Sequence, residues 1–264
     1  MRFDWKRSLA NWNGALMFYT CLPIPSQWPL AFEKTARWVP WVGALIGALL
    51  AIADLALFYL SVPRPVRSAL VVALWIALTG GLHLDGVVDS ADGLAVPDKK
   101  RRLEAMSDSR MGAFGGMAMA MLLLLKVMAL SNVSIRSYAE LCFALVAACM
   151  WGRWGQQWAI ARYPYLKKEG KGAFHKAALP SVRYTLPSLF WMLLLTVGLM
   201  LSGVISTHIA LQASIGGLVL AFMTSAYFAR QLGGHTGDTY GAVVEWTETL
   251  LLCLLTAGAG RFSS

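Results

Sequence analysis

The sequence predicts an all-α protein, a polytopic transmembrane helical bundle with about seven spans. Two observations carry this prediction. Of the 264 residues, 57% are hydrophobic and only 14% are charged, whereas soluble domains average about 45–50% apolar and about 25% charged residues. The apolar residues also gather in stretches of about 20, the length at which a helix crosses a bilayer. The whole chain, 1–264, is therefore expected to form a single integral membrane domain.

Each span is expected to be helical, because backbone groups in lipid must be satisfied within their own segment. Residues 1–37 differ from the rest. Leu9–Pro29 is apolar, but Pro23 and Pro25 interrupt it, so this N-terminal segment is expected to be interfacial or re-entrant. The predicted spans are Trp38–Val62, Val66–Leu84, Gly112–Leu130, Tyr138–Ile160, Leu186–Ser206, Ile209–Ala229 and Asp238–Gly258.

The connections between spans differ in charge, and this difference predicts the orientation. The links 95–111 and 161–185 are rich in lysine and arginine, whereas most connections on the opposite side carry one such residue or none. The positive-inside rule places the basic links, and with them the N-terminus, in the cytoplasm. Arg64 and Arg67 are the exception, because this orientation places them outside. The net charge of +9 is thus a topology signal, and no nucleic-acid-binding pattern competes with it.

The most informative stretch is the acidic motif GGLHLDGVVDSADGL at residues 80–94. Asp85, Asp89 and Asp92 fall at i, i+4 and i+7, a spacing that puts three carboxylates on one helix face. Like charges repel, so a cation is expected there, and a hard divalent ion prefers oxygen ligands. A solvated acidic helix face is the alternative. Residues 85–111 are therefore predicted to form a cytoplasmic link that carries the acidic motif.

A second acidic set opens and enters the last apolar run. Asp238 begins the run, and Glu245 and Glu248 lie inside it. Carboxylates within a membrane are costly and by default indicate function. Glu245 follows Asp238 by seven residues, on nearly the same helix face, and is expected to complete the metal shell or to orient an inner ligand. Glu248 lies deeper and is expected to be protonated or paired with a cation such as Arg153. Structural pairing of both glutamates is the alternative.

Further candidates surround the two acidic sets. His83 and His235 would act as ligands or proton carriers, or as hydrogen-bonded structural residues. Lys126 is expected to snorkel to the far interface, with a substrate contact as the alternative. The predicted catalytic residues are Asp85, Asp89, Asp92, Asp238 and His83; the predicted substrate contacts are Arg102, Arg110, Arg153, Arg162, Lys126 and His235; the predicted metal ligands are Asp85, Asp89, Asp92, Asp238, Glu245 and Asp108.

The chemistry that these residue types favour is metal-assisted transfer of a phosphate-containing group. The chain contains neither a GxxxxGK[ST] loop nor an HExxH motif. Carboxylates that hold a metal, together with arginine and lysine, suit phosphoryl or nucleotidyl transfer. The metal bridges phosphate oxygens and stabilises the leaving phosphate.

The motifs together resemble the adenosylcobinamide-GDP ribazoletransferase (cobalamin synthase) family nearly end to end. Residues 80–94 resemble its signature GGxHxDGxxDxxDG, and RRLEAMSDSRMGAFGG resembles the RxxEIMxDSRxGxxG that follows. LMFYTCLPIPS, Lys126 in LLLLK, ARYPYLKKEGKGAF and GGHTGDTYGAVVEWTE also have family counterparts. Two departures are visible. Cys21 stands where arginine is common, and Leu166-Lys167 replaces a frequent Ala-Arg pair. The second change is expected to weaken a phosphate contact, because lysine cannot form the bidentate fork of arginine.

The resemblance implies an enzyme that joins adenosylcobinamide-GDP to α-ribazole, or to α-ribazole 5′-phosphate, and releases GMP. It implies Mg²⁺ as the cofactor. It also implies a multi-pass protein in the bilayer of the bacterial inner membrane, with an active site that faces the cytoplasm. Nucleic acid is not an expected partner, and a homo-oligomer is compatible with the sequence.

Two rival functions are weighed against this one. A CDP-alcohol phosphotransferase also uses an Asp cluster led by Asp-Gly, but it has an Ala-Arg pair where this chain has Asp89-Ser90. An ion-coupled transporter would line a pathway with Asp54, Arg153, Glu245 and Glu248. The compact motif at the membrane edge favours the enzyme over the transporter.

Overall fold

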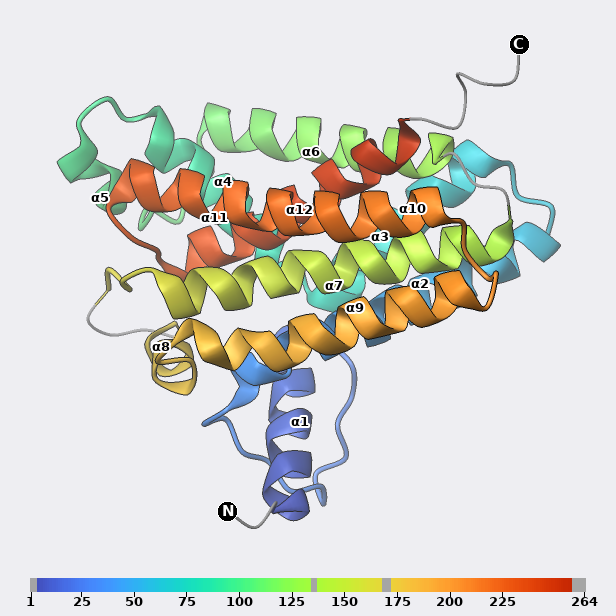
Figure 1. The fold of residues 1–264 in the computed structure, drawn as a ribbon. Coiled ribbons are helices and arrows are strands. Elements are labelled where there is room, and N and C mark those ends of the chain that lie inside the picture. The colour runs from blue at the N-terminus through green and yellow to red at the C-terminus, as the bar shows by residue number, and fades with distance from the viewer. Residues whose placement is uncertain (1–3, 134–136, 168–171, 258–264) are drawn as a thin grey trace.

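The computed structural model describes residues 4–133, 137–167 and 172–257, and every regular element within these residues is helical (Figure 1). The all-α prediction is confirmed. In chain order the elements are α1 (Trp5–Tyr19), η1 (Thr35–Arg37), α2 (Val39–Tyr59), α3 (Arg64–Thr79), α4 (Leu82–Ala95), η2 (Lys99–Arg101), α5 (Arg102–Ala105), α6 (Ala113–Asn132), α7 (Tyr138–Arg162), α8 (Ala173–Ala178), η3 (Val182–Thr185), α9 (Leu186–Leu201), α10 (Thr207–Leu211), η4 (Gln212–Gly216), α11 (Gly217–Leu232) and α12 (Gly237–Thr256).

Helices occupy all of the predicted span segments, and several are long and apolar enough to cross a membrane. Within the described residues, 4 helical stretches meet this requirement, or 5 if the bent pair α3 and α4 is one span. The chain is therefore a multi-pass membrane protein, while the count of seven stays a prediction. Helices α7 and α12 are long enough, at 25 and 20 residues, but they carry buried charges. The stretches that pass are Val39–Tyr59, Ala113–Asn132, Val182–Leu201 and Thr207–Leu232.

The predicted span Val66–Leu84 is wrong at its C-terminal end. Helix α3 stops at Thr79, and Gly80 and Gly81 follow with φ values of 60° and 70°. Glycine adopts this left-handed conformation without the steric cost that other residues bear. Helix α4 then leaves at 92° to α3. The bend turns the acidic motif away from the line of α3 and lays it against α12.

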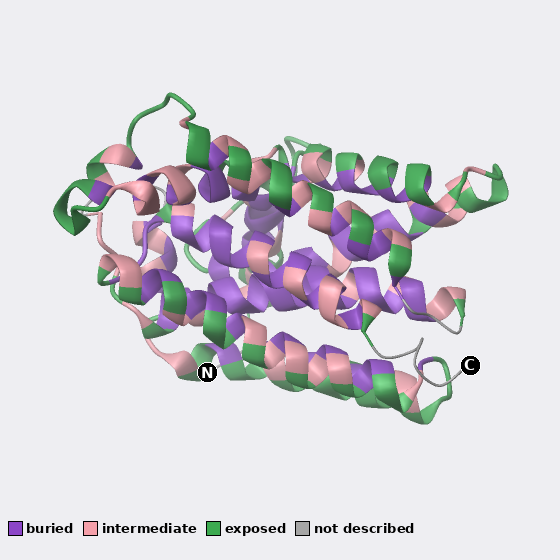
Figure 2. Cartoon of the chain, turned by 90° about the horizontal axis from the view of Figure 1, so that it is seen from above, coloured by how far each residue is buried: buried purple, intermediate pink, exposed green. Residues whose placement is uncertain are grey.

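Helix α7 runs through the centre of the bundle and packs against α2, α11 and α12. Its side chains are buried nearly all round, whereas the outer helices have faces that are partly exposed (Figure 2). The exposed side chains of the outer helices are largely apolar, as Leu124 on α6 and Phe190 on α9 illustrate. An apolar exposed belt around a buried core is the arrangement that lipid requires.

The basic links lie together at one end of the bundle. The α4–α6 connection with α5, the α7–α9 connection with α8, and the α11–α12 turn all occupy this end (Figure 1). The interior of the second link, 168–171, lies outside the described residues. At the opposite end Arg67 donates to Asp54 over 2.7 Å, and both side chains are buried. Arg64 donates to the Val133 carbonyl. The two arginines that disagree with the charge rule are thus structural.

Residues 4–37 form a separate layer beside the bundle. Helix α1 ends at Tyr19, before the two prolines, and it lies across the direction of the long helices (Figure 1). The segment after it folds back, because Asn13 donates to the Pro29 carbonyl and the Asn11 side chain accepts from the Lys34 amide. This arrangement brings the end of α1 to the site described next.

Candidate functional site

The two acidic sets meet where α4 crosses the N-terminus of α12. A Cβ atom on Gly86 would lie 2.3 Å from the Asp238 carbonyl oxygen, and one on Gly241 would lie 3.0 Å from the His83 backbone. Only glycine permits this approach. The crossing therefore places Asp238 beside the acidic face of α4, at the end of the bundle that carries the basic links (Figure 1).

Four carboxylates interact around this crossing. Asp89 interacts electrostatically with Asp85, Asp92 and Asp238, and also with Lys167. The Lys167 ammonium lies 3.1 Å from Asp238 Oδ2. Asp85 is exposed, and Asp89 and Asp238 are half-buried. Excess negative charge on oxygen donors is what a hard divalent cation requires, so the donor chemistry fits a metal. Among the described residues, however, no three such side chains already stand in metal-binding proximity.

Asp92 has a second role that its position on the acidic face does not reveal. Its two carboxylate oxygens accept from the amides of Gly112 and Gly115, over 2.7 and 2.8 Å. Gly112 is the N-cap residue of α6 and Gly115 lies in its first turn, where a negative charge interacts favourably with the helix dipole. Asp92 thus fastens the end of the long link between α4 and α6 to α4. Its predicted metal role stays a prediction.

A cavity of about 200 Å³ opens beside Asp85 and Asp238, between α1, α4, α7, α8 and α12. Aromatic side chains from α1 form one wall, and there Tyr19 stacks on His175 with its hydroxyl 3.2 Å from Nε2. Burial lowers the pKa of His175 to about 3, so this histidine is neutral at physiological pH. The remaining lining includes the side chains of His83, Gln156 and Tyr240.

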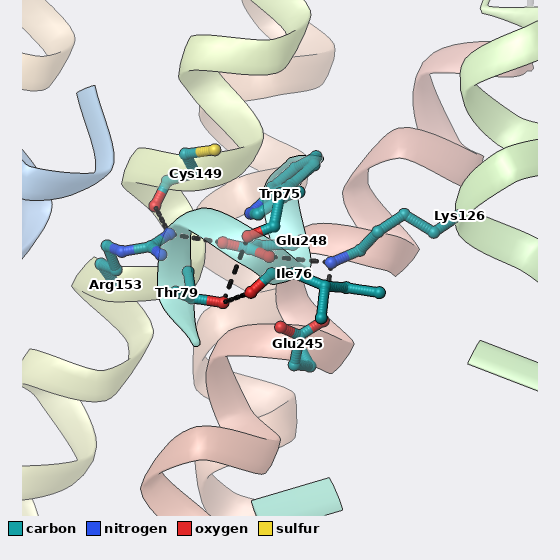
Figure 3. Close-up of polar contacts among 8 residues, drawn as sticks. All are labelled: Trp75, Ile76, Thr79, Lys126, Cys149, Arg153, Glu245 and Glu248. Atoms are coloured by element: carbon teal, nitrogen blue, oxygen red, sulfur yellow. Dashed lines mark hydrogen bonds and ion pairs between the residues drawn. The ribbon is translucent and has the colours of Figure 1, made fainter. Parts of the chain in front are cut away.

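Deeper in the bundle, Glu245 and Glu248 take part in a buried ion-pair network (Figure 3). Lys126 Nζ lies 2.6 Å from Glu245 and 3.0 Å from Glu248, and it also lies 4.2 Å from the centre of the Trp75 ring. Arg153 lies 2.6 Å from the other oxygen of Glu248. Two cations thus balance two anions. The predicted pairing of Glu248 with Arg153 is confirmed. The expected snorkelling of Lys126 is wrong, because two carboxylates inside the bundle hold its ammonium.

Comparison with known proteins identifies the family of this chain. The family model of cobalamin-5-phosphate synthase matches residues 11–256. The chain belongs to this family.

Curated relatives of the cobalamin-5-phosphate synthase family match nearly the full chain. A protein of Trichormus variabilis is 52% identical over 95% of this chain and 98% of its own length, and one of Thermosynechococcus vestitus is 51% identical over 94% and 97%. One of Synechocystis is 46% identical over 94% and 96%. Each is named adenosylcobinamide-GDP ribazoletransferase. No solved structure matches the chain.

The remaining predicted substrate contacts of this cobalamin-5-phosphate synthase member include three arginines with different environments. Arg110 is exposed and makes a bidentate pair with Asp108, at 2.7 and 3.1 Å, and this hydrogen bonding lowers the pKa of Asp108 to about 2. Arg102 donates to Gln231 at the end of α11. Arg162 is exposed at the end of α7. The predicted substrate roles of these arginines and the metal role of Asp108 stay predictions.

His235 has the structural role that was the alternative to ligation. Its ring nitrogens lie 3.0 Å from Thr239 Oγ1 and 3.1 Å from the Ser225 carbonyl. Burial lowers its pKa to about 4, so the ring is neutral and both nitrogens are used. His83, by contrast, lines the cavity beside Asp85.

Four polar cavity residues were not among the predicted site residues, namely Tyr19, Gln156, His175 and Tyr240. Gln156 is a polar residue inside a buried span, which is itself a sign of function. An uncharged amide is a weaker signal than a charged side chain such as that of Arg153. Tyr240 lies two residues after Asp238, inside an apolar run. The sequence of such a run does not indicate whether a tyrosine lines a cavity or packs in the core.

Proposed function

We propose that the chain is an adenosylcobinamide-GDP ribazoletransferase. It joins adenosylcobinamide-GDP to α-ribazole or its 5′-phosphate at the cytoplasmic face of the bacterial inner membrane. The supporting observation is the convergence of Asp85, Asp89 and Asp238 beside a cavity, at the basic end of a membrane bundle that belongs to this family.

The reaction exchanges a phosphoanhydride bond for a phosphodiester bond. A ribazole hydroxyl oxygen forms a bond to the phosphorus attached to cobinamide and loses its proton to solvent. The bond from this phosphorus to the oxygen of the GMP phosphate breaks, and GMP leaves with the electron pair. Negative charge builds on the pyrophosphate oxygens, so cationic partners are required.

The proposed Mg²⁺ would be held by Asp85, Asp89 and Asp238, with Asp92 at the side of the cluster. When bound, it would neutralise phosphate charge and stabilise the leaving GMP. Lys167 already pairs with Asp238 and supplies a positive charge at the same place. The carboxylates themselves would hold the cation beside the cavity mouth.

The rival functions are less well supported by the contacts. All four residues that a transporter pathway would use are engaged in ion pairs, with Asp54 bound to Arg67 and the others in the network of Figure 3. Release of GMP from adenosylcobinamide-GDP by the purified protein, dependent on Mg²⁺ and on α-ribazole, separates the three functions. Transport without GMP release, or release of CMP from a CDP-alcohol, would contradict the proposal.

The orientation can be tested with single cysteines. In a Cys21→Ser background we expect Ser107→Cys, in the exposed basic link, to react with a membrane-impermeant thiol reagent only after spheroplasts are opened. Ser202→Cys, exposed at the opposite end, is the matched control and should react in intact spheroplasts. The reverse pattern of labelling would place the candidate site outside the cytoplasm.

Arg110 is expected to serve as a phosphate clamp, because a bidentate guanidinium suits phosphate and its exposed fork would exchange the Asp108 carboxylate for a substrate phosphate. Arg110→Lys keeps the charge but loses the fork. We expect kcat/KM for adenosylcobinamide-GDP to fall about tenfold, a loss of one charge-assisted contact. Arg101→Lys, also exposed in the same link, is the control and should retain activity. Unchanged kinetics in Arg110→Lys would reduce Arg110 to a topology signal.

A further inference from the structure

Three buried polar side chains line the cavity below the carboxylates and have free hydrogen-bonding atoms. Both ring nitrogens of His83, Oε1 of Gln156 and the Tyr240 hydroxyl have no hydrogen-bond partner within the part of the chain that the structure describes. Their side chains all line the cavity, and they are only 2%, 4% and 1% exposed. Buried polar groups are nearly always paired, so this set indicates a ligand that pairs them.

The three side chains come from three different helices that packing holds in place. His83 belongs to α4, where the close contact with Gly241 fixes its backbone. Gln156 projects from the central helix α7. The Tyr240 ring stacks on Tyr165 and on His235, with ring centroids 6.0 and 5.3 Å away. A rigid set of polar atoms binds a ligand with little loss of side-chain entropy.

The mixture of donors and acceptors identifies the ligand chemistry. Gln156 Oε1 only accepts, the Tyr240 hydroxyl donates and accepts, and a neutral imidazole at His83 does one of each. A charged imidazolium at His83 would be costly at this depth. Phosphate oxygens only accept, so they cannot donate to the acceptor atoms of this set, and Asp85 and Asp238 at the mouth repel anions as well. Neutral hydroxyl groups satisfy the whole set.

We infer that His83, Gln156 and Tyr240 form a ribose-binding subsite that orients the sugar next to the reacting phosphate. The inference rests on the proposed function, in which the acceptor hydroxyl belongs to the ribose of α-ribazole and the departing GMP carries a second ribose. In α-ribazole the ribose carries the attacking hydroxyl, and in adenosylcobinamide-GDP the guanosine ribose is attached to the departing phosphate. The cavity volume of about 200 Å³ admits a sugar and excludes the corrin ring. The three residues are positioning residues.

The test is Tyr240→Phe, which removes one hydroxyl and keeps the ring. If the subsite holds the acceptor ribose, KM for α-ribazole should rise roughly five- to tenfold, the effect of one lost hydrogen bond. If it holds the guanosine ribose, KM for adenosylcobinamide-GDP should rise instead. Equilibrium dialysis of each substrate alone should show the same loss of affinity without turnover. Gln156→Met, of similar length, should shift the same substrate.

The matched control is Tyr138→Phe, at the opposite end of the bundle. The Tyr138 hydroxyl donates to Asp54 over 2.9 Å, so its removal should lower the apparent Tm and leave both KM values unchanged. Tyr240→Phe should leave the apparent Tm unchanged and raise one KM value, because the Tyr240 hydroxyl has no hydrogen-bond partner within the described residues. Unchanged KM values and unchanged dialysis affinities for both substrates in Tyr240→Phe would overturn the subsite.

The two proposals fail in different ways. A wild-type protein that releases GMP while Tyr240→Phe and Gln156→Met behave like wild type would overturn only the subsite. A wild-type protein that releases no GMP would overturn the proposed function. Equilibrium dialysis then still tests the subsite. A lower affinity for a riboside in Tyr240→Phe than in the wild type would support the subsite, and an equal affinity would overturn it.

Discussion

Replacing Asp89 with asparagine should lower the rate of GMP release on the order of 100-fold, the size of effect expected when a charge that stabilises the transition state is removed. Asp89 interacts with the carboxylates of Asp85 and Asp238 and with Lys167, so it lies at the centre of the cluster. The amide keeps the shape of the side chain and removes its charge. The apparent Tm in detergent should stay at or above the wild-type value, because repulsion among the carboxylates falls.

The matched control is Asp98→Asn, which makes the same change on an exposed carboxylate of the same link. Asp98 caps η2, where its side chain accepts from the Lys100 amide, and it has no proposed part in the reaction. The Asp98→Asn variant should therefore keep both activity and Tm. Asp89→Asn should be measured at limiting and at saturating Mg²⁺. Near-normal turnover at limiting Mg²⁺ would remove Asp89 from the proposed metal site.

The parts of the fold that the sequence predicts are those that a single segment encodes. The length of an apolar stretch determines whether a helix can span the bilayer, and helices accordingly occupy every predicted span segment. The spacing of Asp85, Asp89 and Asp92 is also local, so their common helix could be predicted. The bend after Thr79 was missed, because Gly80 and Gly81 were read as part of one apolar run rather than as two consecutive left-handed residues.

The parts that could not be predicted depend on contacts between distant segments. Lys126 and Glu245 are 119 positions apart, and no periodicity in either helix indicates that their side chains meet. The free polar atoms of Gln156 and Tyr240 face one cavity because α7 and α12 pack side by side. Asp92 shows the same principle. Its spacing places it on the acidic face, while the packing of α6 gives it backbone amides to bind.

Replacing Glu248 with glutamine should destabilise the protein more than any other change in the bundle interior considered above. Glu248 is fully buried and links Arg153 to Lys126 (Figure 3). Glutamine leaves two cations facing one carboxylate, and its amide donor would face a cationic donor. Breaking one partner of a buried ion pair costs about 3 kcal/mol or more, which corresponds to an apparent Tm lower by roughly 6–12 °C. Thermal unfolding in detergent measures this shift.

Glu245→Gln is the comparison that separates a structural role from a metal role. Within the described network, Glu245 forms an ion pair only with Lys126. Its replacement leaves the Arg153–Glu248 pair intact and should lower the Tm less than Glu248→Gln does. If Glu245 serves the network, the Mg²⁺ concentration for half-maximal GMP release should be unchanged in both variants. A higher Mg²⁺ requirement in Glu245→Gln would support its predicted metal role. If the network stabilises the bundle, its charge-balanced set of four groups cannot lose one member without a loss of stability. A wild-type Tm in Glu248→Gln would therefore show that the network does not stabilise the bundle.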